Sequence, residues 1–393
     1  MRDGSGADSV RNGVPDGAPV SRDRSLALAV FLAAFGLLGT QAALRYSPAM
    51  YYEGDCPYYI STTLSIGNDF DIDLRNQLRG GLEVHGKQIA LGRGGQWYPK
   101  HPLLMPVLAL PFYALFGMPG FALFGVLVAG MLAAVLYFLA RGFAPPLPAA
   151  AAAFLMIAGT FLRRYDYNLT PDLLSALVAA CGLLAVLRGR NAAGGILLGT
   201  AVLAKPTNLF LLAFAWTYAL VCRGRRGLVG SIVGSAGPLA VLLLLNQAQF
   251  GSPFTSSYDR NVLSRDGELA MVSHRGQFDK NPMRGLSGEL LDRDHGLLPT
   301  SPALFLALPG FALMYRRHRR EAMLLLLLGE FYLLLFATYR YWNTTAYGNR
   351  FLILLLVLAA PPTALALEWI AGRVTGGRTL LRLRTGTAAQ SGS

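Results

Sequence analysis

The sequence predicts an all-α integral membrane protein, a polytopic bundle of about ten (ten to twelve) transmembrane helices with a long first external loop that contains surface helices. Three observations predict this class. Hydrophobic residues make up 53% of the 393 residues and charged residues only 15%. Apolar runs such as 25–44 contain no charged residue and are long enough to cross a hydrocarbon layer of ~30 Å. The basic residues stand in short clusters between these runs, which is how topology signals are distributed in membrane proteins.

The apolar runs define the candidate spans in chain order. The first run is too long for a signal peptide and lacks a small-residue cleavage site, so we expect it to remain as the first span. Residues 1–24 are predicted to form a disordered cytoplasmic tail, 25–371 one transmembrane domain, and 372–393 a basic cytoplasmic tail. The predicted spans are 25–44, 119–140, 147–162, 171–187, 191–204, 206–222, 228–245, 298–315, 321–338 and 350–371.

One further apolar run, 102–117, is interpreted as a re-entrant or surface-lying helix. Pro102, Pro106 and Pro111 interrupt it, so a helix there would be kinked and shorter than the membrane core. If this run does not cross, the arginines between the spans fall on the same side as the basic amino-terminal tail. Both termini are then cytoplasmic, and two external loops, about 45–118 and 246–297, carry most of the carboxylates. Any chemistry is therefore expected outside.

Composition also argues against some classes of function. The net charge of +13 could suggest nucleic acid, but the arginines are spread between apolar runs and no nucleic-acid-binding motif is present. Cys56, Cys181 and Cys222 fall in different segments, so neither a disulfide framework nor a thiolate metal site is indicated. No cofactor is indicated with certainty. A divalent metal ion at Asp69, Asp71 and Asp73 is conceivable, although their alternation is more typical of a solvated turn.

The first external loop contains the strongest candidates for catalysis. Glu53 and Asp55 stand two residues apart among tyrosines, just beyond the first span. A carboxylate partly desolvated by neighbours such as Tyr58 has a raised proton affinity and could act as a general base toward a hydroxyl group. The alternative is purely structural, with Asp55 as a helix N-cap and Pro57 in the first turn.

Four basic residues are candidates for binding a phosphate. Lys100 and His101 lead into the surface helix and could hold a phosphate by charge-assisted hydrogen bonds, whereas interfacial anchoring is the alternative. Lys205 lies in a tight external turn, where it could reach an anionic headgroup. Arg350 lies at the outer end of the last span, where its guanidinium could bind a phosphate through two hydrogen bonds. The alternative is that the side chain only extends from the apolar span to the membrane surface.

Four further residues are candidates for substrate binding, together with Tyr58. Asp166 follows two arginines in an external turn that breaks the positive-inside trend, so it belongs to an ion pair or to a second part of the site. Asp172 lies in the first turn of a span, where it could simply favour the helix N-terminus. His295 ends the second external loop, and Trp342 lies in the last external turn.

The order of these motifs along the chain resembles the GT-C glycosyltransferases, the group that includes polyprenyl-phosphate-dependent mannosyl- and aminoarabinosyltransferases. The resemblance covers roughly 25–371. The chain departs from the family pattern at Cys56, where a second carboxylate is usual, and at Leu103, where a second proline is usual. The matching stretches are GDCPYY at 54–59 with NDFDI at 68–72, HPL at 101–103, GLLPTSP at 296–302 and YGNRF at 347–351.

The resemblance implies transfer of a sugar from a polyprenyl-phosphate donor to a glycolipid, glycan or protein acceptor at the outer face of a bacterial cytoplasmic membrane. Asp55 would be the base, and Lys100, His101 and Arg350 would stabilise the leaving phosphate. Three alternatives stay open. A transporter or lipid flippase should place polar groups near the midplane, where only Glu330 is expected. A polysaccharide polymerase or ligase should depend on a late loop, and a structural envelope protein should tolerate replacement of its external acids.

Overall fold

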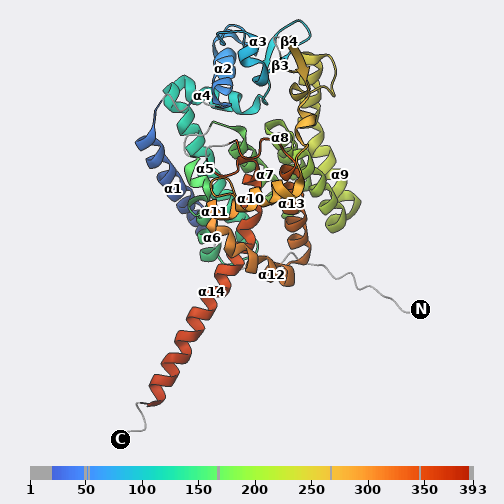
Figure 1. Cartoon of the computed structure of the whole chain (residues 1–393). Helices are drawn as coiled ribbons and strands as arrows, with labels where there is room; N and C mark the ends of the chain where they lie inside the picture. Colours follow the sequence, from blue (N-terminus) through green and yellow to red (C-terminus); the bar gives the residue numbers. More distant parts are fainter. Residues whose placement is uncertain are drawn as a thin grey trace, which may run out of the picture.

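The fold is a bundle of helices that is capped at one end by a smaller lobe (Figure 1). This computed structural model describes residues 20–47, 51, 54–165, 169–265, 268–344 and 347–388. The short helices α2 and α3 and the strands β3 and β4 lie in the lobe (Figure 1). The helices are α1 Val20–Arg45, α2 Cys56–Leu64, α3 Leu82–His85, α4 Leu104–Phe116, α5 Met118–Arg141, α6 Pro146–Ala158, α7 Pro171–Leu187, α8 Asn191–Ala204, α9 Asn208–Phe250, α10 Pro282–Leu291, α11 Leu297–Thr300, α12 Ala307–Arg317, α13 Arg319–Ala337 and α14 Ile353–Ala388.

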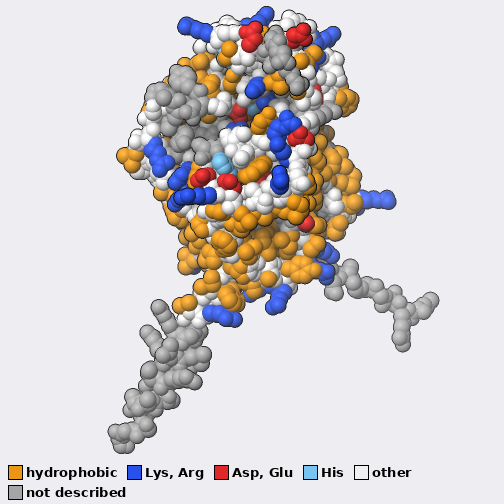
Figure 2. All heavy atoms as spheres, in the orientation of Figure 1, with side chains coloured by type: hydrophobic (Ala, Val, Ile, Leu, Met, Phe, Trp, Pro, Cys, Tyr) orange, Lys and Arg blue, Asp and Glu red, His pale blue; other side chains and the backbone are white. Residues whose placement is uncertain are grey.

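The chain is a multi-pass membrane protein. Within the described residues, four helical stretches are long and apolar enough to cross a membrane, namely Ser21–Arg45, Met118–Arg141, Asn208–Phe250 and Arg350–Val374. Four shorter apolar helices, α4, α6, α7 and α8, accompany them. The face shown in Figure 2 has an apolar band across the helical part, between the charged side chains of the lobe and basic side chains at the opposite end. Such a band is what a lipid-facing surface requires.

The last long helix is the inner helix of the bundle. Its first part is buried, and it packs against α5, α6, α7, α12 and α13. By contrast, α9 exposes apolar side chains such as Val221 and Leu244 along its length. The start of α14 faces the lobe, while its other end projects from the opposite side of the bundle (Figure 1). A residue at the start of α14 is therefore held at the centre of the lobe-facing end.

Several boundaries differ from the predicted spans. The runs 206–222 and 228–245 both lie in α9, where two helices meet at a kink at Gly224, whose non-helical φ of 64° and ψ of −161° are unstrained only for glycine. The predicted span 298–315 is broken, because Pro302 forces the preceding Ser301 out of the helical region. The amino-terminal tail ends earlier than predicted: α1 begins at Val20, and Asp23 in its first turn pairs with Arg141. In the predicted basic tail 372–393, α14 continues to Ala388.

Helix α4 occupies the run that was interpreted as re-entrant or surface-lying. It begins after Pro102 and has 13 residues, with Pro111 in its interior. At ~1.5 Å per residue it is shorter than the hydrocarbon core. Gly117, with φ 63°, turns the chain directly into α5. That α4 does not cross the membrane stays a prediction.

The all-α prediction is wrong in the lobe, which contains a four-stranded antiparallel sheet. The strands are β1 Ile89–Leu91, β2 Trp97–Pro99, β3 Asn261–Arg265 and β4 Glu268–Val272, in the order β2-β1-β3-β4. Strands of three to five residues are too short to show a period of two in the sequence. The pairing of Ala90 with Asn261 joins the two predicted external loops. The two loops therefore form one lobe.

Helices α8 and α9 approach each other backbone to backbone. A Cβ atom on Gly195 would lie 2.1 Å from the carbonyl oxygen of Ser231, and one on Gly234 would lie 2.1 Å from that of Ala192. Close approach through small residues is a common way for helices to associate in a membrane, where burial of apolar surface gives no driving force.

We predict that Gly195→Ala destabilises the protein by about 1–3 kcal/mol, because a backbone oxygen cannot move aside as a side chain can. The measurement is the thermal unfolding midpoint of the purified protein in detergent, which should fall. Gly125→Ala in α5 is the control, because nothing lies within 4 Å of the added Cβ. Equal midpoints for both variants would contradict this account of the α8–α9 contact.

Candidate active site

Asp55 lies where the chain enters the lobe, at the start of α2. Gly54, with φ 61°, allows the turn that precedes it, and Pro57 lies in the first turn of the helix. Asp55 occupies the N-cap position, yet its carboxylate makes no capping hydrogen bond. Its backbone oxygen accepts instead, from the amide groups of Tyr58 and Tyr59. The cap alternative therefore accounts for the position of Asp55 but not for its side chain.

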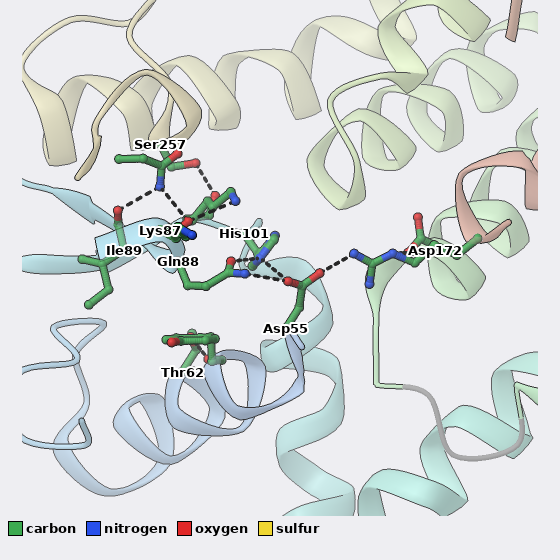
Figure 3. A network of polar contacts seen from close by, with 12 residues as sticks. Asp55, Thr62, Lys87, Gln88, Ile89, His101, Asp172 and Ser257 are labelled. Atoms are coloured by element: carbon green, nitrogen blue, oxygen red, sulfur yellow. Dashed lines mark hydrogen bonds and ion pairs between the residues drawn. The ribbon is translucent and has the colours of Figure 1, made fainter. Parts of the chain in front are cut away.

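The Asp55 carboxylate is held by groups from both ends of the chain. Arg350 Nη2 donates to Oδ2 at 2.5 Å across 295 residues of sequence. Gln88 Nε2 donates to Oδ1 at 2.9 Å, and Gln88 Oε1 lies 2.8 Å from His101 Nε2. His101 Nε2 is itself 3.5 Å from Asp55 Oδ1. Figure 3 shows Gln88 and His101 together on one side of Asp55.

A second acid continues this arrangement into the bundle. Asp172, in the first turn of α7, accepts a hydrogen bond at 2.6 Å from Lys205 Nζ, and its other oxygen lies 3.8 Å from Arg350 Nε. Four side chains thus form a row of alternating charge, which we call the ion row: Asp55, Arg350, Asp172 and Lys205. None of the four side chains is more than 17% exposed. Lys205 also faces the rings of Phe336 and Phe351, each 5.2 Å away.

Aromatic rings enclose His101. The ring of Tyr59 stacks on the imidazole at 5.0 Å, and that of Tyr258 meets it edge-on at 6.3 Å. Tyr58, the predicted substrate-binding tyrosine, turns toward His85 instead, with its hydroxyl oxygen 3.0 Å from Nδ1. The rings keep water from the imidazole, so interactions of His101 with charge are stronger than they would be in solution.

The register of the β1–β2 hairpin places Lys100 and His101. Ile89 pairs with Pro99, and the Lys100 amide donates to the Gln88 carbonyl at 3.1 Å, so Gln88 and His101 lie side by side. The Lys100 side chain is buried, and its ammonium group donates to the Lys87 carbonyl at 3.1 Å.

Burial and neighbouring charges shift two pKa values at the site. Burial alone would raise the pKa of Asp55, but His101 and Arg350 outweigh it through charge and hydrogen bonds and hold this pKa well below its ordinary value. Burial lowers the pKa of Lys100 to about 8, although the Asp55 charge opposes that change. Asp55 is therefore ionised at neutral pH, and Lys100 is mostly protonated.

The described residues leave little free space beside the ion row. A cavity there has a volume of about 10 Å³, room for roughly one water molecule. Its lining includes Asp172, Ser175, Lys205, Asn208 and Arg350. Because Arg350 already contacts two carboxylates, an anion that bound its guanidinium would compete with them.

Among the remaining predicted residues, those that the structure describes do not join the ion row. His295 and Trp342 lie in a second cluster, where their rings meet edge-on at 6.4 Å and His295 Nδ1 is 3.1 Å from an oxygen of Asp292. Glu53 and Asp166 lie outside the described residues. Glu330 lies on an exposed face of α13.

The acidic stretch of the first loop forms a hydrogen-bonded turn. Asp71 accepts from the Ser65 hydroxyl and the Asp73 amide, while Asp73 binds Arg75. Asp69 accepts from Asn76. Across the part of the chain that the structure describes, no group of three or more His, Cys, Asp or Glu side chains is placed to hold a metal ion.

Three residues of the site region were not predicted. Gln88 links Asp55 to His101, and the buried pair of Glu289 and Asn349 lies behind Arg350. No local pattern marks Gln88, because its role depends on the hairpin register. Asn349 directly precedes Arg350 in the YGNRF stretch, and this adjacency was the available signal.

Comparisons with known proteins identify the fold. No protein-family model matches the sequence, and no curated protein matches it by sequence. Among solved structures, ArnT from Cupriavidus metallidurans bound to undecaprenyl phosphate is similar over 94% of this chain, with a TM-score of 0.58 and 16% identity. The oligosaccharyltransferase of Archaeoglobus fulgidus in the apo form is similar over 91%, with a TM-score of 0.59 and 16% identity.

The oligosaccharyltransferase AglB from Archaeoglobus fulgidus, in complex with an inhibitory peptide and a dolichol-phosphate, is similar over 92% of this chain, with a TM-score of 0.55 and 14% identity. The chain thus has the GT-C membrane fold of ArnT and AglB, as the resemblance in sequence predicted. It spans 63% of the length of ArnT and 52% of the length of the oligosaccharyltransferase in these structures.

We predict that Lys205→Met lowers stability by about 3 kcal/mol, because it removes the nearest cation of a buried carboxylate. The double variant Asp172→Asn/Lys205→Met should lose much less than the sum of the two single variants, since it leaves no unpaired charge between these positions. Thermal unfolding midpoints of the four proteins in detergent measure this coupling. Additive losses would show that the 2.6 Å contact carries no stabilising interaction.

Proposed function

We propose that the chain is a membrane glycosyltransferase that moves a sugar from a polyprenyl-phosphate carrier to an acceptor hydroxyl or amine at the outer face of a bacterial cytoplasmic membrane. One observation carries this proposal: a buried carboxylate, Asp55, meets the His101 imidazole and the Arg350 guanidinium, with Lys100 nearby, at the lobe-facing end of a GT-C fold. A base and phosphate-binding cations are the two things that this transfer requires.

The reaction assigns a separate role to each group. The acceptor oxygen or nitrogen attacks the anomeric carbon, and its proton passes to Asp55. The bond between that carbon and the phosphate oxygen breaks, and the lipid phosphate leaves with the electron pair. Lys100, His101 and Arg350 stabilise the charge that gathers on the phosphate, in a site from which the rings of Tyr59 and Tyr258 exclude water.

Donor binding also prepares the base. While Arg350 is paired with Asp55, the low pKa of the carboxylate makes it a weak proton acceptor. A donor phosphate competes for Arg350, because the guanidinium already contacts the carboxylates of Asp55 and Asp172. Loss of that cation raises the proton affinity of Asp55. The base thus becomes effective when the donor is in place.

The location of the ion row also supports this function over a transporter. A transporter would be expected to bind its substrate near the midplane on interrupted helices. Here Asp55 lies at the start of α2, Asp172 in the first turn of α7 and Arg350 just before α14. Glu330, the acid expected near the midplane, faces outward. The acceptor, whether glycolipid, glycan or protein, would approach from the lobe, and both termini would be cytoplasmic.

We predict that Asp55→Asn abolishes transfer while the protein is still made and inserted in the membrane, because the amide cannot take the acceptor proton. Envelope glycolipids and glycans are compared by mass spectrometry in cells with the wild-type chain, no chain and the variant. One sugar mass should disappear from the second and third. Asp279→Asn, at an exposed acid that pairs with Arg340, is the control and should keep that mass.

Should the Asp55→Asn cells keep the sugar, the carboxylate is not the base, and a transporter becomes the better interpretation. A polymerase or ligase would instead change the length or attachment of a polysaccharide, without removing a single sugar mass from a glycolipid.

A second prediction concerns Lys100. Because burial lowers its pKa to about 8, the amine is charged below that pH and loses its charge as the pH rises through it. The affinity for undecaprenyl phosphate should therefore fall between pH 7 and pH 9, whereas a Lys100→Met variant should bind more weakly at pH 7 and change little over that range. The measurement is binding to the purified protein in detergent. A wild-type affinity that is constant with pH would exclude Lys100 from the phosphate site.

A further inference from the structure

Helix α10, in the second external loop, carries a buried carboxyl group that the proposed mechanism does not use. Glu289 is fully buried, with 0% of its surface exposed. Its Oε1 accepts a hydrogen bond at 3.3 Å from Asn349 Nδ2, while its buried Oε2 has no hydrogen-bond partner among the described residues. A carboxylate in that position would be strongly disfavoured. Burial raises the pKa of Glu289 to about 8, so the group is mostly neutral at pH 7.

The partner of Glu289 directly precedes Arg350. Asn349 is also fully buried, and its Oδ1 accepts from the Phe351 amide at 3.1 Å. This bond caps the short 3-10 turn Arg350–Leu352, which carries the arginine of the ion row. The Asn349 side-chain amide is therefore held through both of its polar atoms: the oxygen accepts from the turn that it caps, and the nitrogen donates to Glu289.

Helix α10 is itself fixed against its surroundings. A Cβ atom on Gly285 would lie 1.7 Å from the carbonyl oxygen of Ala337, so α10 touches the end of α13 backbone to backbone. Gly288 lies against the ring of Trp342 in the same way. Asn281 caps the start of the helix by accepting from two amide groups. Glu289 thus projects from a rigid support.

We propose that Glu289 is a positioning residue that acts through Asn349 to hold the turn that carries Arg350, so that the guanidinium stays within reach of both Asp55 and the donor phosphate. This inference rests on the proposed function. The physical reason is geometric: the contact of Arg350 with Asp55 is only 2.5 Å long, and a displacement of ~1 Å at a reacting centre can reduce the rate about 100-fold. Without Glu289, the Asn349 amide nitrogen loses its hydrogen bond, and the turn that carries Arg350 is free to shift.

The test compares Glu289→Gln, Glu289→Leu and the control Ser287→Ala, which changes an exposed residue of the same helix. Transfer is measured with the purified protein and the polyprenyl-phosphate sugar identified by the deletion experiment. Glu289→Leu should lower kcat about 10- to 100-fold, leave the KM for the acceptor unchanged and weaken binding of undecaprenyl phosphate. Glu289→Gln should restore kcat to within about twofold of wild type, because its amide oxygen accepts the same hydrogen bond.

Asn349→Ser supplies a second measurement that does not depend on the folding of Glu289→Leu. Serine can cap the turn but is too short to reach Glu289, so this variant should lower kcat in the same way. In the double variant Glu289→Leu/Asn349→Ser, kcat should be no lower than in the worse single variant.

Three results would overturn the proposal: a Gln variant as impaired as the Leu variant, multiplicative losses in the double variant, or an unchanged kcat in Asn349→Ser. Each would be obtained with a wild-type protein that transfers sugar, so the proposed function would stand. A wild-type protein that transfers no sugar would instead overturn the proposed function and this inference together.

Discussion

The ion pair between Asp55 and Arg350 is the interaction on which the rest of the site depends. It joins the first loop to the start of the last long helix, and both side chains are largely removed from water. A buried pair of this kind is more stable when hydrogen bonds satisfy its remaining polar groups. Gln88 and His101 contact Asp55, whereas Arg350 Nε makes no hydrogen bond among the described residues and lies 3.8 Å from an oxygen of Asp172. Three local structures hold the residues of this ion pair and their neighbours in place: the turn before α2, the β1–β2 hairpin and the cap at Asn349.

In this arrangement the charges of the site residues neutralise one another. Carboxylates and cations alternate along the ion row, so no single charge is left uncompensated in a closed site. The same pairing makes Asp55 a poor base and occupies Arg350. In the proposed reaction, a ligand with its own negative charge would remove both constraints at once, because it would replace a carboxylate at the guanidinium. The selectivity for an anionic donor would then arise from competition within the site rather than from an open pocket.

The sequence predicts which charged residues belong to the site better than it predicts which of them are in contact. Asp55, His101, Asp172, Lys205 and Arg350 are visible because charged residues beside apolar runs are few, and the topology places these ends together. Which of them touch depends on the hairpin register and on the turn before α14, neither of which has a local signature. The strands are too short to show a period-two pattern. Helix α10 lies in a segment whose sequence is mostly polar. The sequence therefore predicts neither Gln88 nor the burial of Glu289.

The pairing of Ala90 with Asn261 and of Asp55 with Arg350 also fixes when the site comes into being. Synthesis proceeds at roughly 5–20 residues per second, so about 15–60 s separate the two members of the ion pair as the chain emerges. For that whole interval the first loop exists without the final helix, and for most of it without β3. Asp55 therefore meets its cation only after the whole bundle has been inserted. The order of biogenesis keeps an incompletely made chain from presenting a finished site.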